Sequence, residues 1–551
     1  MQGSIVRACA LMLFVAPALF AAQSALAAVL PGAVPTGQLP AAAAPTHYKL
    51  DLTIRPKLAS FSGTVAIDIT LKEPARFLYL HGKELNVTQA ELVSRTQSEI
   101  VTYAQVSPTG VARIDFGREV PAGAITLRVA FNAPYNDGLD GLYRASDSGN
   151  WYAFSQFEAI SARYLFPCFD QPGFKTPFDI TVTAEQTDAV IANTPAAKIQ
   201  MLPGGLKRVT FATTEPLPTY LLAFAVGPLD MVRGPDIPAT KLRARPIPLG
   251  GVAVKGKGPQ LAIALEETPA IVTILEDYFA IPYPYAKLDL IAAADFAAGA
   301  MENAGAIAYR ETRVLLEPNA PISQMREFEL VHAHELAHQW FGDLVTPRWW
   351  DDIWLNEAFA TWMGNKLAAV WQPNGSYERQ TIYRASDTMN EDALAHARRI
   401  HEPVADEDGI ASAFDGITYQ KGCAGVHESD VRELSRARGL PQRARAKSPD
   451  ALPALASHLA AVFSRSRKGS GRPEIVPAFQ TFLDQPGLPL VEQAPGARKN
   501  CGQRSPFRSA TTSRSAASPT SRAAGNGRSP FAFASQAATQ PARSSRRRSK
   551  T

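Results

Sequence analysis

The sequence HELAH at residues 334–338, followed 19 positions later by the acid of WLNEAFA, constrains this chain most. His334 and His338 are one helical turn apart, so a helix places both imidazoles on the same face. Zinc binds imidazole nitrogens and carboxylate oxygens, and a catalytic zinc site keeps three protein ligands and one water. We therefore predict one zinc ion per chain, held by His334, His338 and Glu357, with Glu357 on a second helix over 352–367.

The acid inside the motif has a separate chemical role. Glu335 follows the first histidine directly, so its carboxylate can reach the zinc-bound water and act as a general base. A chance match on a solvated helix is the alternative interpretation, but only 9 of the 551 residues are His. Apolar residues surround the pair, among them Leu330, Val331 and Leu336, which is typical of a buried helix face.

The N-terminus is typical of a secretory signal peptide over residues 1–27. Arg7 supplies a positive charge, residues 8–22 are apolar, and Ala25-Leu26-Ala27 fits the small-residue rule for cleavage. We expect an exported protein, periplasmic or extracellular. The alternative is an uncleaved N-terminal membrane anchor, although the apolar stretch is short for a membrane span. No other apolar stretch reaches spanning length, so we expect no stable membrane span after cleavage.

The rest of the chain divides by pattern. Residues 28–45 are rich in Ala, Pro and Gly and predict a linker. Residues 46–229 contain short alternating runs such as YKLDLTI and AITLRVAF between turn residues, which predict a β-rich domain. Helical periodicity dominates residues 230–422, although a few strands come first. The predicted fold class is therefore an α+β multidomain protein, with a β domain followed by a mostly helical catalytic domain.

The composition changes after Gly422. Residues 423–494 have little periodicity except for an ordinary globular stretch at 473–492, and from 495 to 551 the chain is Ser, Arg, Ala and Pro with few large apolar groups. Such a segment cannot bury enough surface to offset its ordering entropy, so we expect a disordered tail. The formal net charge is +5, yet the stretch from Arg498 onward holds 12 Lys or Arg and no acid, which leaves −7 for the rest. The basic tail is not accompanied by a set of aromatic residues for base stacking or by a nucleic-acid-binding fold, so we expect no nucleic-acid partner.

Five ordered motifs carry a resemblance to a known family. They are SQFEAISARYLFPCFDQP at 155–172, GAMEN at 299–303, HELAH, WLNEAFA, and TYQKG at 418–422. With them the chain resembles the aminopeptidase N family of zinc gluzincins. The resemblance implies an N-terminal β-saddle domain over 46–229, a thermolysin-like catalytic domain over 230–422 and a large helical C-terminal domain. Most of that last domain is missing or scrambled over 423–494, so the resemblance implies a C-terminally truncated or frame-disrupted member.

The resemblance also implies roles for individual residues. Glu302 matches a carboxylate that binds the substrate's free ammonium group, while Gln156 and Glu158 match the amine site and the pocket for the first side chain. Tyr419 matches a tyrosine that donates a hydrogen bond to the tetrahedral oxyanion. Asp343 is a candidate partner for a zinc-binding imidazole. The expected substrate-binding set is Gln156, Glu158, Gly299, Ala300, Met301, Glu302 and Asn303.

The predicted function is that of a zinc aminopeptidase, which hydrolyses the first peptide bond of peptides that have a free N-terminus. An inactive or weakly active zinc-binding relic of the family is one alternative. Another is a gluzincin of different specificity, such as a leukotriene-hydrolase-like enzyme or an endopeptidase. The sequence leaves the side-chain preference and the oligomeric state open.

Overall fold

We analysed a computed structural model, which describes residues 33–93, 98–373, 375, 377–426, 485, 490–492 and 508–510. The signal peptide predicted over 1–27 lies outside the described residues, as does nearly all of the C-terminal remnant predicted over 423–494. Of the tail predicted over 495–551, only Arg508–Ala510 is described, as strand β22 paired with β21 (Leu490–Glu492). Within the described part of the chain, no helix is both long and apolar enough to cross a membrane.

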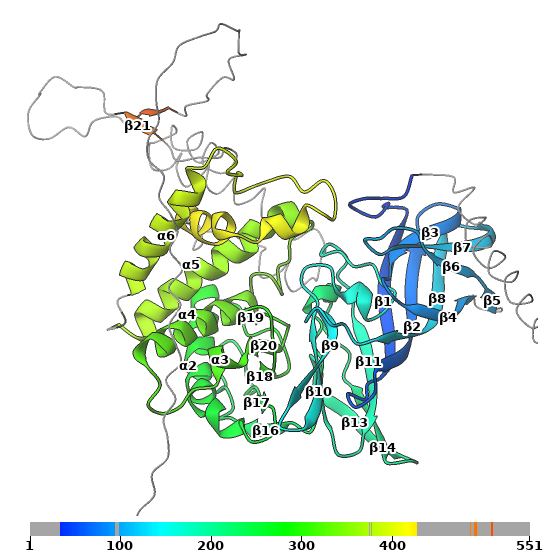
Figure 1. The fold of residues 1–551 in the computed structure, drawn as a ribbon, viewed down its shortest axis with the longest axis horizontal. Coiled ribbons are helices and arrows are strands. Elements are labelled where there is room, and N and C mark those ends of the chain that lie inside the picture. Colours follow the sequence, from blue (N-terminus) through cyan, green and yellow to red (C-terminus); the bar gives the residue numbers. More distant parts are fainter. Residues whose placement is uncertain are drawn as a thin grey trace, which may run out of the picture. The chain divides into compact units, whose positions relative to one another are not determined.

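The first domain consists of strands, as the alternating sequence predicts. An eight-stranded sheet has the order β13-β14-β11-β1-β2-β8-β4-β5, and Figure 1 shows β1, β2, β8 and β4 side by side. The strands of this sheet are β1 (Ala43–Thr53), β2 (Ser60–Leu71), β4 (Asn86–Val93), β5 (Ser98–Ile100), β8 (Gly123–Pro134), β11 (Phe178–Glu185), β13 (Ala196–Leu202) and β14 (Leu206–Phe211). Every second residue of β2 from Val65 to Leu71 is buried, so the alternation in the sequence marks the face of the sheet that contacts the core.

Two smaller sheets complete this domain. The four-stranded sheet has the order β12-β15-β10-β9, and the three-stranded sheet the order β3-β7-β6. Their strands are β3 (Ala75–His81), β6 (Thr102–Gln105), β7 (Val111–Val120), β9 (Gly141–Asp147), β10 (Asn150–Gln156), β12 (Ala189–Ile191) and β15 (Ala225–Gly227). Strand β10 ends at Gln156, so the SQFE motif lies at the end of a buried strand.

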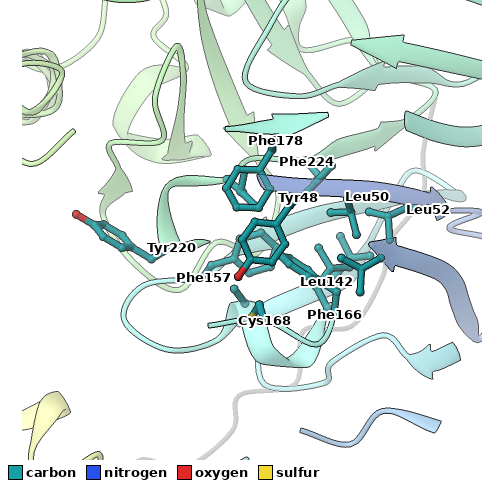
Figure 2. Packing of buried hydrophobic residues seen from close by; sticks show 14 of the residues in the cluster. Tyr48, Leu50, Leu52, Leu142, Phe157, Phe166, Cys168, Phe178, Tyr220 and Phe224 are labelled. Carbon is teal, nitrogen blue, oxygen red and sulfur yellow. The ribbon is translucent and has the colours of Figure 1, made fainter. Parts of the chain in front are cut away.

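Aromatic side chains fill the core between these sheets (Figure 2). The Tyr48 ring stacks on the Phe178 ring with centroids 4.6 Å apart, and the Phe166 ring meets Tyr48 edge-on at 6.0 Å. The Tyr48 hydroxyl accepts a hydrogen bond from the Phe169 backbone N–H at 3.0 Å, which satisfies the polar end of a buried ring. The core therefore holds the segment after SQFE firmly against strand β1.

The second domain combines a five-stranded sheet with helices. The sheet has the order β16-β17-β18-β20-β19, with β17, β18 and β20 parallel. Its elements are β16 (Asp230–Arg233), β17 (Leu249–Ala253), α2 (Ala262–Phe279), β18 (Leu288–Ala293), β19 (Ala300–Met301), β20 (Ala306–Arg310), α3 (Glu311–Val314), α4 (Ile322–His338), α5 (Ile353–Trp371), α6 (Tyr377–Asp392) and α7 (Gly422–Gly425). Strand β19 forms the edge of this sheet and contains the centre of the GAMEN motif.

Helices α4 and α5 pack against each other and carry the metal motifs (Figure 1). A tight turn follows α4, and Gly342 in this turn has φ +121°, where an L side chain is strained. A Cβ atom at Gly342 would also lie 2.3 Å from Asn356 Oδ1 on α5. Glycine at this position therefore allows the end of α4 to approach α5 closely.

The predicted fold class is confirmed: a β-rich domain precedes a mostly helical domain that begins at β16. The segment expected to be a linker differs in its second half. Strand β1 already begins at Ala43, Leu39 is buried, and the Thr36 carbonyl accepts a hydrogen bond from the Glu407 backbone N–H at 2.9 Å. This segment packs because its apolar residues, such as Leu39 and Ala43, are part of the hydrophobic core.

Candidate active site

Helix α4 brings two imidazoles together, and α5 supplies a carboxylate beside them. The Nε2 atoms of His334 and His338 are 2.9 Å apart. The Glu357 Oε2 atom lies 3.3 Å from His334 Nε2 and 3.5 Å from His338 Nε2. These three side chains each offer one ligand atom within 4.8 Å of the others, and two of them are buried. The structure thus brings together the three residues that the sequence predicts as metal ligands.

One of the imidazoles has a fixed orientation. His338 Nδ1 is 2.8 Å from Asn356 Oδ1 and 2.9 Å from the Phe341 carbonyl oxygen, both of which are acceptors. Nδ1 therefore carries a hydrogen, and Nε2 faces Glu357, where it can bind a metal ion once it has lost its own proton. The expectation that Asp343 fills this role is wrong. Both carboxylate oxygens of Asp343 are buried without a hydrogen-bond partner in the described part of the chain, and His338 Nδ1 contacts Asn356 and Phe341 instead.

The acid inside HELAH is buried and lacks a partner. Glu335 is 6% exposed, and its Oε2 atom has no hydrogen bond within the described part of the chain. Burial raises the pKa of Glu335 well above its usual range; the charge of His338 opposes this shift, while Glu302 adds to it. An unpartnered carboxylate beside a cluster of imidazole and carboxylate ligands fits a site that holds a divalent metal ion and its substrate.

Further carboxylates lie on the other side of the ligands. Oxygen atoms of Glu158, Glu302 and Glu357 all lie within 4.8 Å of one another. Asn356 Nδ2 donates a hydrogen bond to Glu302 Oε1 at 3.2 Å, which fixes this carboxylate relative to α5. Burial raises the pKa of both Glu158 and Glu302. So many buried acids repel one another, and a cation between them would stabilise the group.

All these groups line a single cavity of about 440 Å³. Of the residues that the sequence assigns to substrate binding, the cavity is lined by Gln156, Glu158, Gly299, Ala300 and Glu302. Met301 and Asn303 do not line it. The Met301 side chain points into the core, and Asn303 Nδ2 donates to the Leu222 carbonyl oxygen at 3.0 Å. Only part of the motif therefore faces the cavity.

Tyr419 reaches the cavity from a short π-helical turn, Ile417–Lys421. Its ring lies 6.3 Å from the His334 ring, centroid to centroid. Burial raises the pKa of Tyr419 well above its usual range, and nearby carboxylates, Glu357 foremost, raise it further, so the phenol stays protonated. Arg398 supports this turn through hydrogen bonds to Asp415 and, at 2.6 Å, to Thr418 Oγ1. The geometry leaves Tyr419 as a hydrogen-bond donor toward the ligand cluster.

Comparison with known proteins agrees with this geometry. The Peptidase M1 N-terminal domain matches residues 44–221, and the Peptidase family M1 domain matches residues 263–429. Aminopeptidase M1-B of Oryza sativa subsp. japonica is 36% identical over 397 residues, which is 70% of this chain and 44% of that protein. Aminopeptidase M1 of Arabidopsis thaliana is 32% identical over 474 residues, which is 82% of this chain and 51% of that protein. Endoplasmic reticulum aminopeptidase 2 of Homo sapiens is 34% identical over 400 residues, which is 70% of this chain and 41% of that protein.

The chain belongs to peptidase family M1. The chain spans about half the length of the curated relatives it matches. Within this M1 peptidase, four residues near the ligands escaped prediction from sequence: Asn356, Thr361, Arg384 and Phe414. Thr361 Oγ1 lies 3.4 Å from His334 Nδ1, one helical turn after Glu357 on α5. Asn356 directly precedes the third ligand and Thr361 follows it by four residues, and both positions can be read from the sequence. Arg384 and Phe414 come from segments that no motif marks.

Proposed function

We propose that this M1 peptidase is a zinc-dependent aminopeptidase that hydrolyses the first peptide bond of peptides with a free N-terminus. One observation carries the proposal: a single cavity combines the His334, His338 and Glu357 ligand set with the unpartnered Glu335 carboxylate and two further acids, Glu158 and Glu302. These relatives are named aminopeptidases, which supports the same activity.

The donor set fits zinc. Two imidazoles and one carboxylate are ligands that zinc prefers, and three protein ligands leave a coordination position open for catalysis. His334, His338 and Glu357 would hold one ion per chain, and His338 is already oriented by Asn356. When bound, zinc would supply Lewis acidity toward the scissile carbonyl group and toward water.

The remaining steps belong to the chain's own residues. Glu335 accepts a proton from the attacking water and then passes it to the leaving amine, a role that suits a carboxylate whose pKa burial has raised. The protonated phenol of Tyr419 donates a hydrogen bond to the carbonyl oxygen as negative charge develops there. The turn that holds Tyr419 keeps this donor in place before the substrate binds.

Glu158 and Glu302 restrict the reaction to the N-terminal residue. A free ammonium group placed between these carboxylates would form charge-assisted hydrogen bonds and relieve their mutual repulsion. Such contacts hold the first residue at a fixed distance from the ligand cluster, so only the first peptide bond reaches Glu335. A blocked N-terminus cannot supply the positive charge that these buried acids require.

A pair of substrates tests the proposal. Purified protein should hydrolyse an unblocked aminoacyl anilide, should leave its N-acetylated twin intact, and should lose activity when a chelator removes the metal. Glu302→Ala should lower kcat/KM for the unblocked anilide by about 10- to 100-fold, since a charge-assisted contact is lost. Hydrolysis of the blocked twin would favour an endopeptidase, and no hydrolysis of either substrate would favour an inactive relic.

Export is a second part of the proposal and rests on residues 1–27 alone. A protein expressed with its native N-terminus should appear outside the cytoplasm, and N-terminal sequencing should start directly after Ala27. Retention of Met1 on a membrane-bound form would favour the anchor instead.

A further inference from the structure

The charges that line the active-site cavity are distributed unevenly. Glu158, Glu302, Glu335 and Glu357 all line it, whereas Arg384 is the single Lys or Arg among the described lining residues. Arg384 lies on α6 and is exposed. It makes no hydrogen bond or ion pair within the described residues, so its guanidinium group is available to a ligand.

Arg384 also lines a second cavity of about 300 Å³, next to the first. Its lining residues are Ile322, Ser323, Arg326, Glu327, Gln380, Tyr383 and Arg384. The one acid among them, Glu327, forms an ion pair with Arg313, so two guanidinium groups in this cavity lack an acidic partner in the described chain. The Arg326 Nε atom and the Gln380 Oε1 atom are both buried without a hydrogen bond there. The unpartnered Arg326 N–H is a donor, and together with two guanidinium charges it favours an anion in this cavity.

The two cavities share one face of α4. Arg326, Leu330 and His334 follow each other at four-residue spacing, so their side chains lie on the same side of the helix. Leu330 and His334 line the first cavity and Arg326 lines the second. With a rise of about 1.5 Å per residue, Arg326 is roughly 12 Å along the helix from His334. An extended peptide covers this distance with about three to four residues.

We propose that Arg384, with Arg326 beyond it, forms a subsite for the C-terminal carboxylate of short peptides, on the leaving-group side of the scissile bond. The proposal rests on the proposed function, because Glu158 and Glu302 define the amine end of the cavity. Arg384 lines the cavity that holds these acids and the ligand histidines, and it also lines the second cavity together with Arg326. A short peptide would thus extend from the acids, past the ligands, to the guanidinium groups. Arg384 would then determine specificity, not chemistry.

The test compares three substrates that share the N-terminal residue whose anilide is cleaved fastest, followed by Ala-Ala in two of them. One tripeptide ends in a free carboxylate, the second ends in an amide, and the third substrate is the anilide itself. The wild-type kcat/KM should favour the free acid over the amide by about fivefold to tenfold, since Arg384 is exposed and partly screened. Arg384→Gln should remove this preference, and its effect on the free-acid tripeptide should be larger than its effect on the anilide. Arg326→Gln should act more strongly on a tetrapeptide than on the tripeptide.

Arg379→Gln is the matched control, because Arg379 lies on the same helix, is exposed and lines neither cavity. It should keep the wild-type preference.

Equal rates for acid and amide in the wild-type protein, with the anilide cleaved, would overturn the subsite and leave the proposed function intact. An equal loss on all three substrates in Arg384→Gln would also overturn it, since this result indicates a structural role. If the wild-type protein cleaves no anilide, the proposed function fails and the subsite fails with it. An amidated tripeptide with Asp in the second position tests whether the subsite recognises an acidic side chain instead of the terminal carboxylate. If the protein preferred this peptide to the free-acid tripeptide, the assignment would be contradicted.

Discussion

Two buried clusters of charge in this molecule have opposite compositions. In the first, Arg163 lies between Asp170 and Glu407, with Nε 3.0 Å from Asp170 Oδ2 and Nη1 2.9 Å from Glu407 Oε1. His81 joins them, with Nε2 3.0 Å from Glu407 Oε1. In the second, the active-site cavity, four acids surround two imidazoles, and no Lys or Arg pairs with them in the described chain. Both acids of the first cluster, called here the balanced cluster, are paired with Arg163, whereas the acids of the second have no Lys or Arg partner among the described residues.

The difference separates a structural role from a functional one. Arg163 and Asp170 belong to the β domain and Glu407 to the segment before Tyr419, so the balanced cluster fastens that segment to the first domain. The excess charge of the cavity offers nothing to the fold by itself. A divalent cation and the ammonium group of a substrate are the charges that it lacks. Removing one partner of a buried pair leaves the other charge uncompensated, whereas several unpaired buried acids around one cavity mark a candidate ligand site.

The largest effect should come from the unpaired cluster. Glu335→Gln should lower kcat by about 10²- to 10⁴-fold, because the proton acceptor is lost while the metal ligands remain. The metal content, measured by atomic absorption, should stay near that of the wild type. The melting temperature of the metal-free protein should not fall, since the substitution removes one of several mutually repelling acids. A parallel loss of metal and activity would assign Glu335 to the ligand set instead.

The paired cluster should respond in stability. Arg163→Met removes the only guanidinium between two buried carboxylates, so the free energy of unfolding should fall by about 3–5 kcal/mol. Urea unfolding followed by tryptophan fluorescence measures this change. Arg118→Met is the control, because its ion pair with Glu99 lies on the surface and should leave the unfolding midpoint nearly unchanged. Equal shifts in both variants would remove the distinction between the two kinds of ion pair.

An intermediate effect should come from Asn356, which links the ligand helices to the acids. Asn356→Ala leaves His338 Nδ1 with only the Phe341 carbonyl oxygen, so zinc affinity should weaken by about 10- to 100-fold. Competition with a chromogenic chelator measures the affinity. Asn365→Ala is a fair comparison, since Asn365 lines the same cavity from the same helix and its one hydrogen bond reaches Cys423 Sγ, not an imidazole. The idea fails if both variants bind zinc alike.

The sequence predicted most of the active site, and the reason lies in local geometry. The spacing of HELAH on a helix determines where His334, Glu335 and His338 point, and Glu357 follows on the next helix of the chain. Asp343 was assigned wrongly because sequence proximity to His338 says nothing of the tight turn at Gly342. Met301 and Asn303 were included because the motif was taken whole, although only part of it lines the cavity.

Long-range contacts explain what the sequence did not reveal. Arg384 reaches the cavity through the packing of α6 on α5, and Glu407 meets Arg163 across more than two hundred residues of chain. Neither of these long-range contacts leaves a periodic pattern in the sequence. The β domain itself was predictable, because alternation in strands such as β2 records which side faces the core. The order of its eight strands was not, since it depends on pairings such as the parallel one of β1 with β11.

The smallest expected effect is the pH dependence of the stability that the cluster around Arg163 contributes. The pKa of Glu407 falls from its ordinary value of 4.5 to about 2: burial opposes the shift, but the hydrogen bond with His81 and the charge of Arg163 outweigh it. A carboxyl whose folded-state pKa is depressed stabilises the fold above its unfolded-state pKa and loses that contribution as the pH falls toward the folded value. Burial, followed by the charge of Arg163, also lowers the pKa of His81, so this group too favours the fold less once the pH falls below about 6.5. Between pH 5 and pH 3.5, the stability advantage of the metal-free wild type over Glu407→Gln should therefore shrink by roughly 1 kcal/mol. Urea midpoints of both proteins across this range measure the change. A constant difference would mean that the segment before Tyr419 is fastened by packing, and that the charges of the balanced cluster contribute little to it.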